Sequence, residues 1–257
     1  MIDGLYDVFK NWSANGSVYI ISDPHFSDTE SFEFRKANGK LPEGINSVED
    51  LDDYIVKNIN SVAHKNDTLV CLGDVGNIEY IKKLKAGYKV LLRGNHDQGK
   101  SYYKKEIHHN FKLGNEFPEE LTYEDILKLG YKEVDATPTD FIFEKVTDNG
   151  LFDEVYSGTL TISDKIILSH EPIIPCPDYL VNLCGHVHDR PHKFKIYQHQ
   201  YYNFCAEAID YKPVSLGKLI KEGMLSNVKD IHRVTADGAI IRKNIRKRHK
   251  AADNLSQ

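Results

Sequence analysis

Five short apolar segments of this chain each end in a turn whose side chains can bind a metal ion or transfer a proton. The clearest segment covers residues 88–92, and Gly94-Asn95-His96-Asp97 follows one residue later. A continuous apolar run of this length is typical of a strand buried on both faces. The other four turns have the same character; they are Asp23-Pro24-His25, Gly73-Asp74, Ser169-His170 and Gly185-His186-Val187-His188. The chain therefore requires a fold that brings the ends of five strands together.

The part of the chain before Asp97 alternates between strand and helix patterns. Ser47-Val48-Glu49-Asp50 has the character of a capping box, and apolar residues at helical spacing predict a helix from there to about Lys65. A shorter helix is expected over residues 78–84, ending at Gly87. Strands are expected on either side of these helices, at 17–22, 67–72 and 88–92. Strands joined through helices indicate βαβ crossovers and a parallel or mixed sheet.

Two segments have no clear hydrophobic period. Residues 27–44 are polar and predict a long loop over the face where Asp23 and His25 emerge. Residues 98–163 are interpreted as an insertion that continues the sheet and shapes one wall of the site. This insertion contains one expected helix, over residues 126–129, which ends at Gly130.

The rest of the chain returns to regular patterns. Strands are expected at 165–168 and 179–184, antiparallel strands within 194–204, and a short helix over 213–221. We interpret residues 1–225 as one domain that includes the insertion. Residues 226–257 are predicted to form a C-terminal hairpin, turning at Asp237-Gly238, and a basic tail.

Composition indicates a soluble protein in a reducing compartment. The 257 residues carry a formal net charge of −5, which gives no general reason to expect nucleic acid. We see no signal peptide and no apolar run near the roughly 20 residues that a membrane helix needs. The scattered cysteines are expected to be buried free thiols; they are Cys71, Cys176, Cys184 and Cys205. These features predict a cytoplasmic location and no membrane partner.

The five turns together supply the ligands of a metal site. Ligands of open α/β sheets bind beyond the carboxyl ends of the strands, so these turns would deliver two or three Asp, one Asn and up to five His to one pocket. Glycines before Asp74, Asn95 and His186 allow the backbone to turn sharply there. Imidazole and carboxylate ligands together favour manganese, iron, zinc or nickel over calcium.

The number of ligands favours two ions over one. Seven candidates exceed what one first-row ion takes, whereas two ions sharing a bridging carboxylate, roughly 3.5–4 Å apart, would use all of them. Such a pair activates water and neutralises a phosphate held across it. A single Asp-x-His or His-x-His turn is usually incidental, but five such turns in succession, each after an apolar run, leave little room for that interpretation.

This set of motifs resembles the calcineurin-like metallophosphoesterase superfamily. The five turns match its five blocks, and the resemblance runs from about residue 17 to residue 213, including the tail Asn203-Phe204-Cys205-Ala206-Glu207. It implies an α/β fold, a four-layered α/β/β/α sandwich with mixed sheets and a dimetal site at its edge. The insertion and the basic C-terminus lie outside the resemblance.

The resemblance also implies a role for each site residue. Three residues would hold one ion, namely Asp23, His25 and His188. Three others would hold the second ion, namely Asn95, His170 and His186, and Asp74 would bridge the two. His96 would stabilise the transition state or protonate the leaving oxygen, and Asp97 would orient the His96 imidazole.

The sequence departs from the protein Ser/Thr phosphatases of that superfamily. Those enzymes carry Gly-Asp-x-x-Asp-Arg-Gly in the second block, where this chain has Asn77 and no following Arg. They also end the third block in Glu, where this chain has Asp97. These differences argue against a phosphoprotein phosphatase, and the sequence is closer to the small phosphoesterases of bacteria and phages.

The leading hypothesis is a phosphoester hydrolase with two divalent ions, manganese foremost and iron, zinc or nickel as alternatives. A hydroxide bridging the metals would attack the phosphorus of a small phosphodiester or phosphomonoester, such as a nucleotide, with His96 assisting departure. One alternative is a nuclease, in which the basic run of residues 242–250 grips a phosphate backbone. Another is a non-catalytic metal-binding scaffold. The sequence does not indicate the oligomeric state or the natural substrate.

Overall fold

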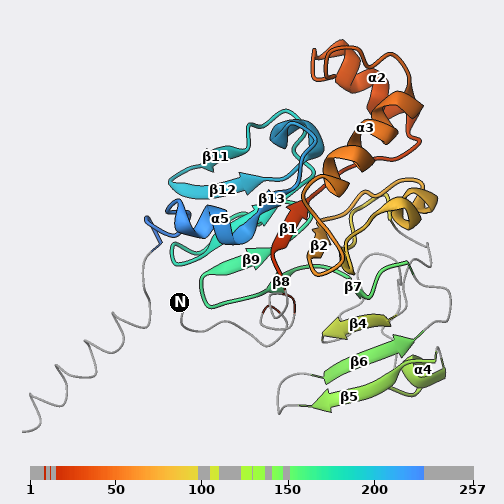
Figure 1. The fold of residues 1–257 in the computed structure, drawn as a ribbon. Coiled ribbons are helices and arrows are strands. Elements are labelled where there is room, and N and C mark those ends of the chain that lie inside the picture. Colours follow the sequence, from red (N-terminus) through yellow and green to blue (C-terminus); the bar gives the residue numbers. More distant parts are fainter. Residues whose placement is uncertain are drawn as a thin grey trace, which may run out of the picture.

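The computed structural model describes Phe9, Trp12 and residues 16–97, 105–109, 123–128, 130–136, 141–146 and 151–228. Within these residues the strands form two sheets (Figure 1). The larger sheet has the strand order β13-β1-β2-β3-β7-β4-β6-β5. Its strands are β1 (Val18–Ile21), β2 (Thr68–Cys71), β3 (Tyr88–Leu92), β4 (Lys105–His109), β5 (Lys132–Ala136), β6 (Phe141–Val146), β7 (Glu154–Tyr156) and β13 (Val214–Ser215).

The smaller sheet has the order β11-β12-β10-β9-β8. Its strands are β8 (Leu160–Thr161), β9 (Ile166–Leu168), β10 (Val181–Cys184), β11 (Lys193–Ile196) and β12 (His199–Asn203). The helices are α2 (Thr29–Ala37), α3 (Val48–Asn60), α4 (Tyr123–Lys128) and α5 (Leu216–Lys221), with 3₁₀ turns η1 (Ile78–Lys83) and η2 (Ala206–Ile209). Both sheets combine parallel and antiparallel pairs, so the predicted mixed α/β fold is confirmed.

Alternate residues of the central strands point to opposite sides of the larger sheet. Ile20 and Val70 pack between the two sheets, where they meet residues of β9 and β10. Ile21 and Leu69 point the other way, against the apolar side of α3 that includes Ile55. Each aliphatic side chain buried in this way stabilises the fold by about 1.5–3 kcal/mol relative to an exposed position. These strands are covered on both faces, which explains their continuous apolar sequences.

The predicted fourth layer is not confirmed in the described residues. The outer face of the smaller sheet carries Cys184, Phe194 and Tyr201, which pack with Cys176 and Leu180. Those two partners lie in the connection between β9 and β10, so a loop covers this face at that point. Helix α5 instead contributes to the core between the sheets.

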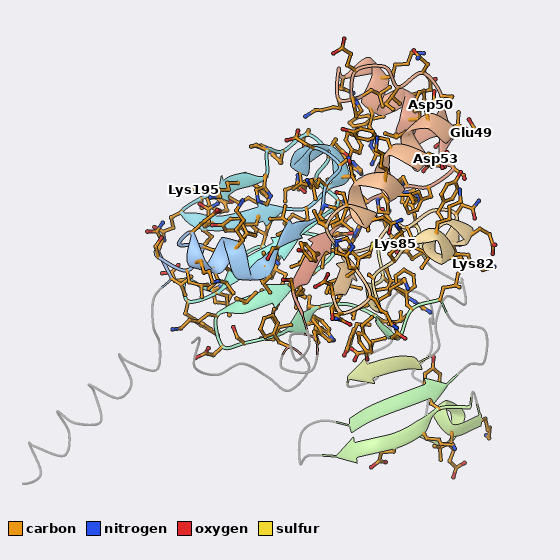
Figure 2. All side chains as sticks on the ribbon, viewed as in Figure 1. Glu49, Asp50, Asp53, Lys82, Lys85 and Lys195 are labelled. Carbon is orange, nitrogen blue, oxygen red and sulfur yellow. The ribbon has the colours of Figure 1, made fainter. Side chains whose placement is uncertain are left out.

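Helix α3 begins as predicted. The Ser47 hydroxyl accepts a hydrogen bond from the Asp50 amide at 3.1 Å, and the Asp50 carboxylate accepts one from the Ser47 amide at 3.1 Å. Figure 2 shows Glu49, Asp50 and Asp53 along the outer side of this helix. Acidic residues in a first turn stabilise the positive end of the helix dipole. The opposite side, with Ile55, packs on the sheet.

The prediction of a loop over residues 27–44 is wrong, because α2 occupies its middle. The Asp28 side chain caps this helix by accepting hydrogen bonds from the Glu30 and Ser31 amides. Only Phe32 and Arg35 of α2 are buried. One buried apolar residue produces no visible hydrophobic period, so the helix could not be identified from the pattern.

The insertion extends the larger sheet, in agreement with the prediction. β7 pairs with β3 in parallel, β4 continues the sheet from β7, and β6 and β5 complete it. These last strands and α4 lie at one end of the molecule in Figure 1, away from α5 and β11. The expected helix is present as α4, close to Gly130. The expected hairpin and basic tail lie outside the described residues.

All four cysteines are buried and free, as the sequence predicted. In the portion of the chain that the structure describes, none of the helices has the length and apolar character needed to span a bilayer.

Candidate metal centre

The topology gathers the five polar turns at one edge of the two sheets. β1, β2 and β3 are parallel neighbours, so the turns that follow them leave the larger sheet side by side. β9 and β10 are also parallel, and their turns leave the smaller sheet together. Backbone hydrogen bonds connect neighbouring turns, from the Asp23 amide to Gly73 O at 2.9 Å and from the Gly185 amide to His170 O at 2.8 Å. The predicted meeting of strand ends is therefore observed.

Several candidate ligands have a positive φ angle, a backbone conformation that residues other than glycine rarely adopt. The φ angles are 54° at Asp23, 51° at His25, 52° at Asp74 and 65° at His186. Residues with a Cβ avoid this left-handed region, and each such position costs of order 1–3 kcal/mol. Four strained residues at one sheet edge indicate a site whose geometry is imposed by the surrounding structure.

Two of the glycines are needed for close approach rather than for a sharp turn. A Cβ on Gly94 would overlap the Asp74 carboxylate, and a Cβ on Gly185 would overlap the Ser22 hydroxyl and the Asp23 carboxylate. At each of these glycines, the backbone of one turn lies in close contact with the candidate ligand of another turn. Only a residue without a side chain fits at these contacts.

The first donor group is centred on Asp23. Its Oδ2 accepts hydrogen bonds from the His186 amide at 3.0 Å and from the Cys205 thiol at 3.4 Å. Its Oδ1 is buried without a hydrogen-bond partner, and it lies 3.3 Å from His188 Nε2 and 3.8 Å from His25 Nε2. A buried carboxylate oxygen facing two imidazole nitrogens matches the environment of a cation ligand.

The second donor group is centred on Asn95. Its Oδ1 lies 2.9 Å from His170 Nε2 and 3.2 Å from His186 Nδ1. His170 is buried, whereas Asn95 and His186 are exposed. This group therefore opens toward solvent.

Asp74 lies between the two groups. Its Oδ2 is 3.3 Å from His170 Nε2 and 3.7 Å from His25 Nε2. Its Oδ1 accepts a hydrogen bond from the His96 amide at 2.8 Å. The same carboxylate oxygen consequently faces one histidine of each group.

The donor set fits divalent metal ions. Donor atoms of Asp23, His25 and Asp74 all lie within 4.8 Å of one another, as do those of Asp74, His170 and His186. Mixed imidazole and carboxylate ligands suit borderline first-row ions. The structure brings together all seven residues predicted as ligands, which are Asp23, His25, Asp74, Asn95, His170, His186 and His188.

The buried carboxylates of the site also favour positive charge close to them. Burial raises the pKa of Asp23, but the neighbouring imidazoles of His188, His25 and His170 outweigh it and hold that pKa well below its usual value. Burial lowers the pKa of His188, yet Asp23 and Glu207 raise it to about 10. In the same way Asp74 raises the pKa of His170 to about 9 against burial. Without metal, protons on these imidazoles supply the charge that a cation would bring.

Three residues behind the ligands were not predicted. Asp28 Oδ2 lies 2.9 Å from His25 Nδ1, and Glu207 Oε1 is hydrogen bonded to His188 Nδ1. The Arg35 side chain is hydrogen bonded to Glu207 in turn. Glu207 belongs to the tail that resembles the superfamily, which was the only available signal. Asp28 and Arg35 lie in the segment that was wrongly expected to be a loop.

The structure does not show the contact predicted for Asp97. Its buried carboxylate accepts hydrogen bonds from the amides of Asp74 at 2.7 Å, Gly94 at 2.9 Å and Val75 at 3.0 Å. Among the described residues, no hydrogen bond joins it to the His96 imidazole. The His96 ring is exposed, and its centroid lies 5.4 Å from that of the His25 ring. Asp97 thus connects the second and third turns through their backbones.

The family that the sequence matches agrees with this geometry. Residues 16–192, well over half of the chain, match the family described as calcineurin-like phosphoesterase. A solved structure of a protein of unknown function, AQ665 from Aquifex aeolicus, is similar with 22% identity and a TM-score of 0.47, covering 80% of this chain and 98% of that chain. None of the curated proteins matches the sequence. From the family match and the donor groups together, the chain belongs to the calcineurin-like phosphoesterase family, and its general activity is metal-dependent hydrolysis of phosphoesters.

Proposed function

We propose that this protein is a dimetal phosphoesterase that hydrolyses a small phosphodiester or phosphomonoester, such as a nucleotide. The observation that carries the proposal is the position of Asp74 Oδ2, which faces His25 at 3.7 Å and His170 at 3.3 Å. A carboxylate oxygen shared by two donor groups is what a pair of neighbouring ions requires. Manganese is the first choice among the borderline metals that these ligands suit.

The two halves of the site would hold one ion each. Asp23, His25 and His188 would bind the first, and Asn95, His170 and His186 the second. When bound, the ions would supply an activated water and a positive charge for the phosphate. The surrounding side chains would donate the proton to the leaving group and keep the ligands in position.

His96 is proposed as the group that gives a proton to the leaving oxygen. Its exposed imidazole reaches an open pocket of about 410 Å³ that His25, Asn77 and residues 27–30 also line. A substrate whose phosphate lies on the ligands could place its leaving group in this pocket. A positioned proton donor contributes about 10²–10⁴-fold to a rate.

Asp97 is proposed to act on the turns rather than on His96. Its carboxylate accepts three backbone hydrogen bonds, which tie Gly94 to Asp74 and Val75. Those contacts keep Asn95 and Asp74 at a constant separation. Burial raises the pKa of Asp97, and the three amide donors lower it in part.

The test is hydrolysis of bis-p-nitrophenyl phosphate and p-nitrophenyl phosphate by metal-stripped protein reconstituted with manganese. Diester turnover would identify a phosphodiesterase, and monoester turnover alone would identify a phosphatase. Failure on both substrates by protein that retains two bound ions would contradict the proposed broad activity and favour the scaffold alternative.

The matching variant is His96→Ala. We expect turnover to fall by about 10²–10⁴-fold, because the leaving group loses its proton donor, while the metal content stays at the wild-type level. His64→Ala, which removes an exposed histidine outside the site, is the control. If His96→Ala loses metal, His96 belongs to the ligand set and the proposed role is wrong.

Nucleic acid is not favoured as a substrate. The nuclease alternative depends on the basic run of residues 242–250, which lies outside the described residues. The proposal keeps a cytoplasmic location, which the four buried free thiols support.

A further inference from the structure

A buried ion pair lies directly behind the first donor group. Arg35 Nε donates to Glu207 Oε2 at 3.0 Å, and both side chains have no exposed surface. Removing two charges from water is unfavourable, and the mutual attraction offsets this only when the geometry and the remaining hydrogen bonds are good. A fully buried ion pair needs further hydrogen bonds, and here they are made with residues of the first donor group.

Glu207 holds one metal-ligand histidine. Its Oε1 is hydrogen bonded to His188 Nδ1. A carboxylate only accepts, so Nδ1 keeps its proton, and in the neutral imidazole that binds a metal the lone pair is on Nε2. His188 Nε2 lies 3.3 Å from Asp23 Oδ1, the buried oxygen without a hydrogen-bond partner. A carboxylate on the far nitrogen sets the tautomer and ring orientation of a metal-binding imidazole and increases its basicity.

Arg35 holds the turn that carries the other ligands of this group. Its Nη2 donates to Asp23 O at 2.6 Å and its Nη1 to Pro24 O at 3.3 Å. Asp23 has φ of 54°, a strained conformation that needs such external support. One guanidinium thereby restrains the backbone of Asp23 and the carboxylate behind His188.

We infer that Arg35 and Glu207 are positioning residues of the first metal position. Glu207 fixes His188 with Nε2 toward the ion, and Arg35 neutralises Glu207 and secures the backbone of the first turn. This inference rests on the proposed function, since it assumes that Asp23, His25 and His188 hold an ion. It also assigns a role to α2, whose sequence shows no hydrophobic period.

A purely structural role is distinguishable, because the fold contains a second buried glutamate of that kind. Glu154 accepts hydrogen bonds from Trp12 at 3.2 Å, Tyr88 at 2.6 Å and Tyr156 at 2.6 Å. All three donors are neutral, and none belongs to the predicted ligands. Loss of its charge should affect folding stability alone, so Glu154→Gln is the matched control.

The experiment is calorimetric titration of the metal-stripped full-length chain with Mn²⁺. Glu207→Gln should weaken binding of one of the two equivalents by about 10–100-fold and leave the other within about threefold, as expected for loss of a carboxylate behind a ligand histidine. Glu154→Gln should leave both equivalents unchanged. If both equivalents bind Glu207→Gln as they bind the wild type, or if Glu154→Gln weakens binding equally, the inference is wrong.

A second set of variants keeps the test decisive if Glu207→Gln folds poorly. Arg35→Met leaves the buried Glu207 carboxylate without its guanidinium partner, so its melting temperature should fall below that of the double variant Arg35→Met with Glu207→Gln. A double variant no more stable than the single one would overturn the pairing. Wild-type protein that binds two Mn²⁺ but hydrolyses no phosphoester would contradict the proposed function alone, because the binding comparison would still stand.

Discussion

The two halves of the candidate metal centre, the donor group around Asp23 and the donor group around Asn95, are built differently. Around Asp23, both histidines are backed by carboxylates, His25 by Asp28 at 2.9 Å and His188 by Glu207. Around Asn95, His170 is backed by the backbone oxygen of Leu72 at 2.8 Å, and His186 has the neutral Asn95 beside it. Ligand type alone therefore does not define a site, because the residues behind the ligands change the charge of the ligands and restrict their orientation.

Exposure differs between the halves for two residues of each, whereas His170 is buried and His188 is half-buried. Asp23 and His25 are buried, whereas Asn95 and His186 are exposed. A more anionic and more enclosed group should bind a divalent ion more tightly, because its charges act through less water. We therefore expect the half around Asp23 to bind its ion first, and the half around Asn95 to exchange its ion more readily.

The largest effect should come from the residue that belongs to both halves. Asp74→Asn removes the shared charge, so binding of both ions should weaken and activity should fall by about 10³-fold, the upper end of the effect of losing a charge-stabilising group. Metal analysis after gel filtration and phosphoesterase assays measure this. Asp53→Asn, on the exposed side of α3, is the control. Loss of only one ion would mean that Asp74 does not bridge.

A pair of histidine variants separates the halves. His188→Ala should lose the tightly held ion, with affinity reduced by at least about 100-fold, because it removes both a ligand and the partner of Glu207. His186→Ala should keep that ion and lose the weaker one. Titration with Mn²⁺ gives both affinities, and equal losses in the two variants would contradict the proposed difference between the halves.

The pH dependence of the metal-free protein tests one histidine of each half. The folded-state pKa values of about 9 for His170 and about 10 for His188 lie above the unfolded value of about 6.5. Their contribution to stability is therefore fully present below pH 6.5 and is lost as the pH rises through 9 and 10.

Melting temperatures between pH 6 and pH 10 check this sign. The metal-free protein should lose stability as these two imidazoles deprotonate, whereas protein loaded with metal, whose imidazoles are already neutral, should lose less. Metal affinity should rise over the same range because fewer protons must be displaced. A metal-free protein that gains stability from pH 7 to pH 10 would contradict the electrostatics described above.

The smallest effect should come from Gly185→Ala. Its Cβ would overlap Ser22 and the Asp23 carboxylate, and overpacking of this kind costs about 1–3 kcal/mol. The expected result is a lower melting temperature and weaker binding of the first ion only. Gly217→Ala is the control, since a Cβ there meets nothing closer than 3.9 Å. Weaker binding of the second ion alone would reverse the assignment of the halves.

The meeting of the candidate ligands could be predicted because each of them is a local feature of sequence. Each ligand follows a buried strand within a few residues, as Asp23 follows β1 and His170 follows β9. Parallel pairing then brings such turns to one edge without further information. The capping box at Ser47 was equally local, and it was confirmed.

Other features could not be predicted because they depend on contacts between distant segments. Helix α2 has one buried apolar residue, Phe32, so no period indicated it. The contact expected between Asp97 and His96 was replaced by three bonds from Asp97 to backbone amides, which no spacing reveals. Backbone donors carry no sequence signal, because every residue except proline has one.

By itself, the sequence determined the fold class, the edge of the sheet that holds the site and the identity of the seven candidate ligands. The reason is that a strand and the polar side chains of the turn after it are both determined by residues that are neighbours in the sequence. Tertiary structure alone decided which groups stand behind the ligands, since Arg35 and Glu207 are 172 positions apart. It also decided that one half of the centre is enclosed and anionic and the other open, because burial and charge at a site arise only when separate segments pack together.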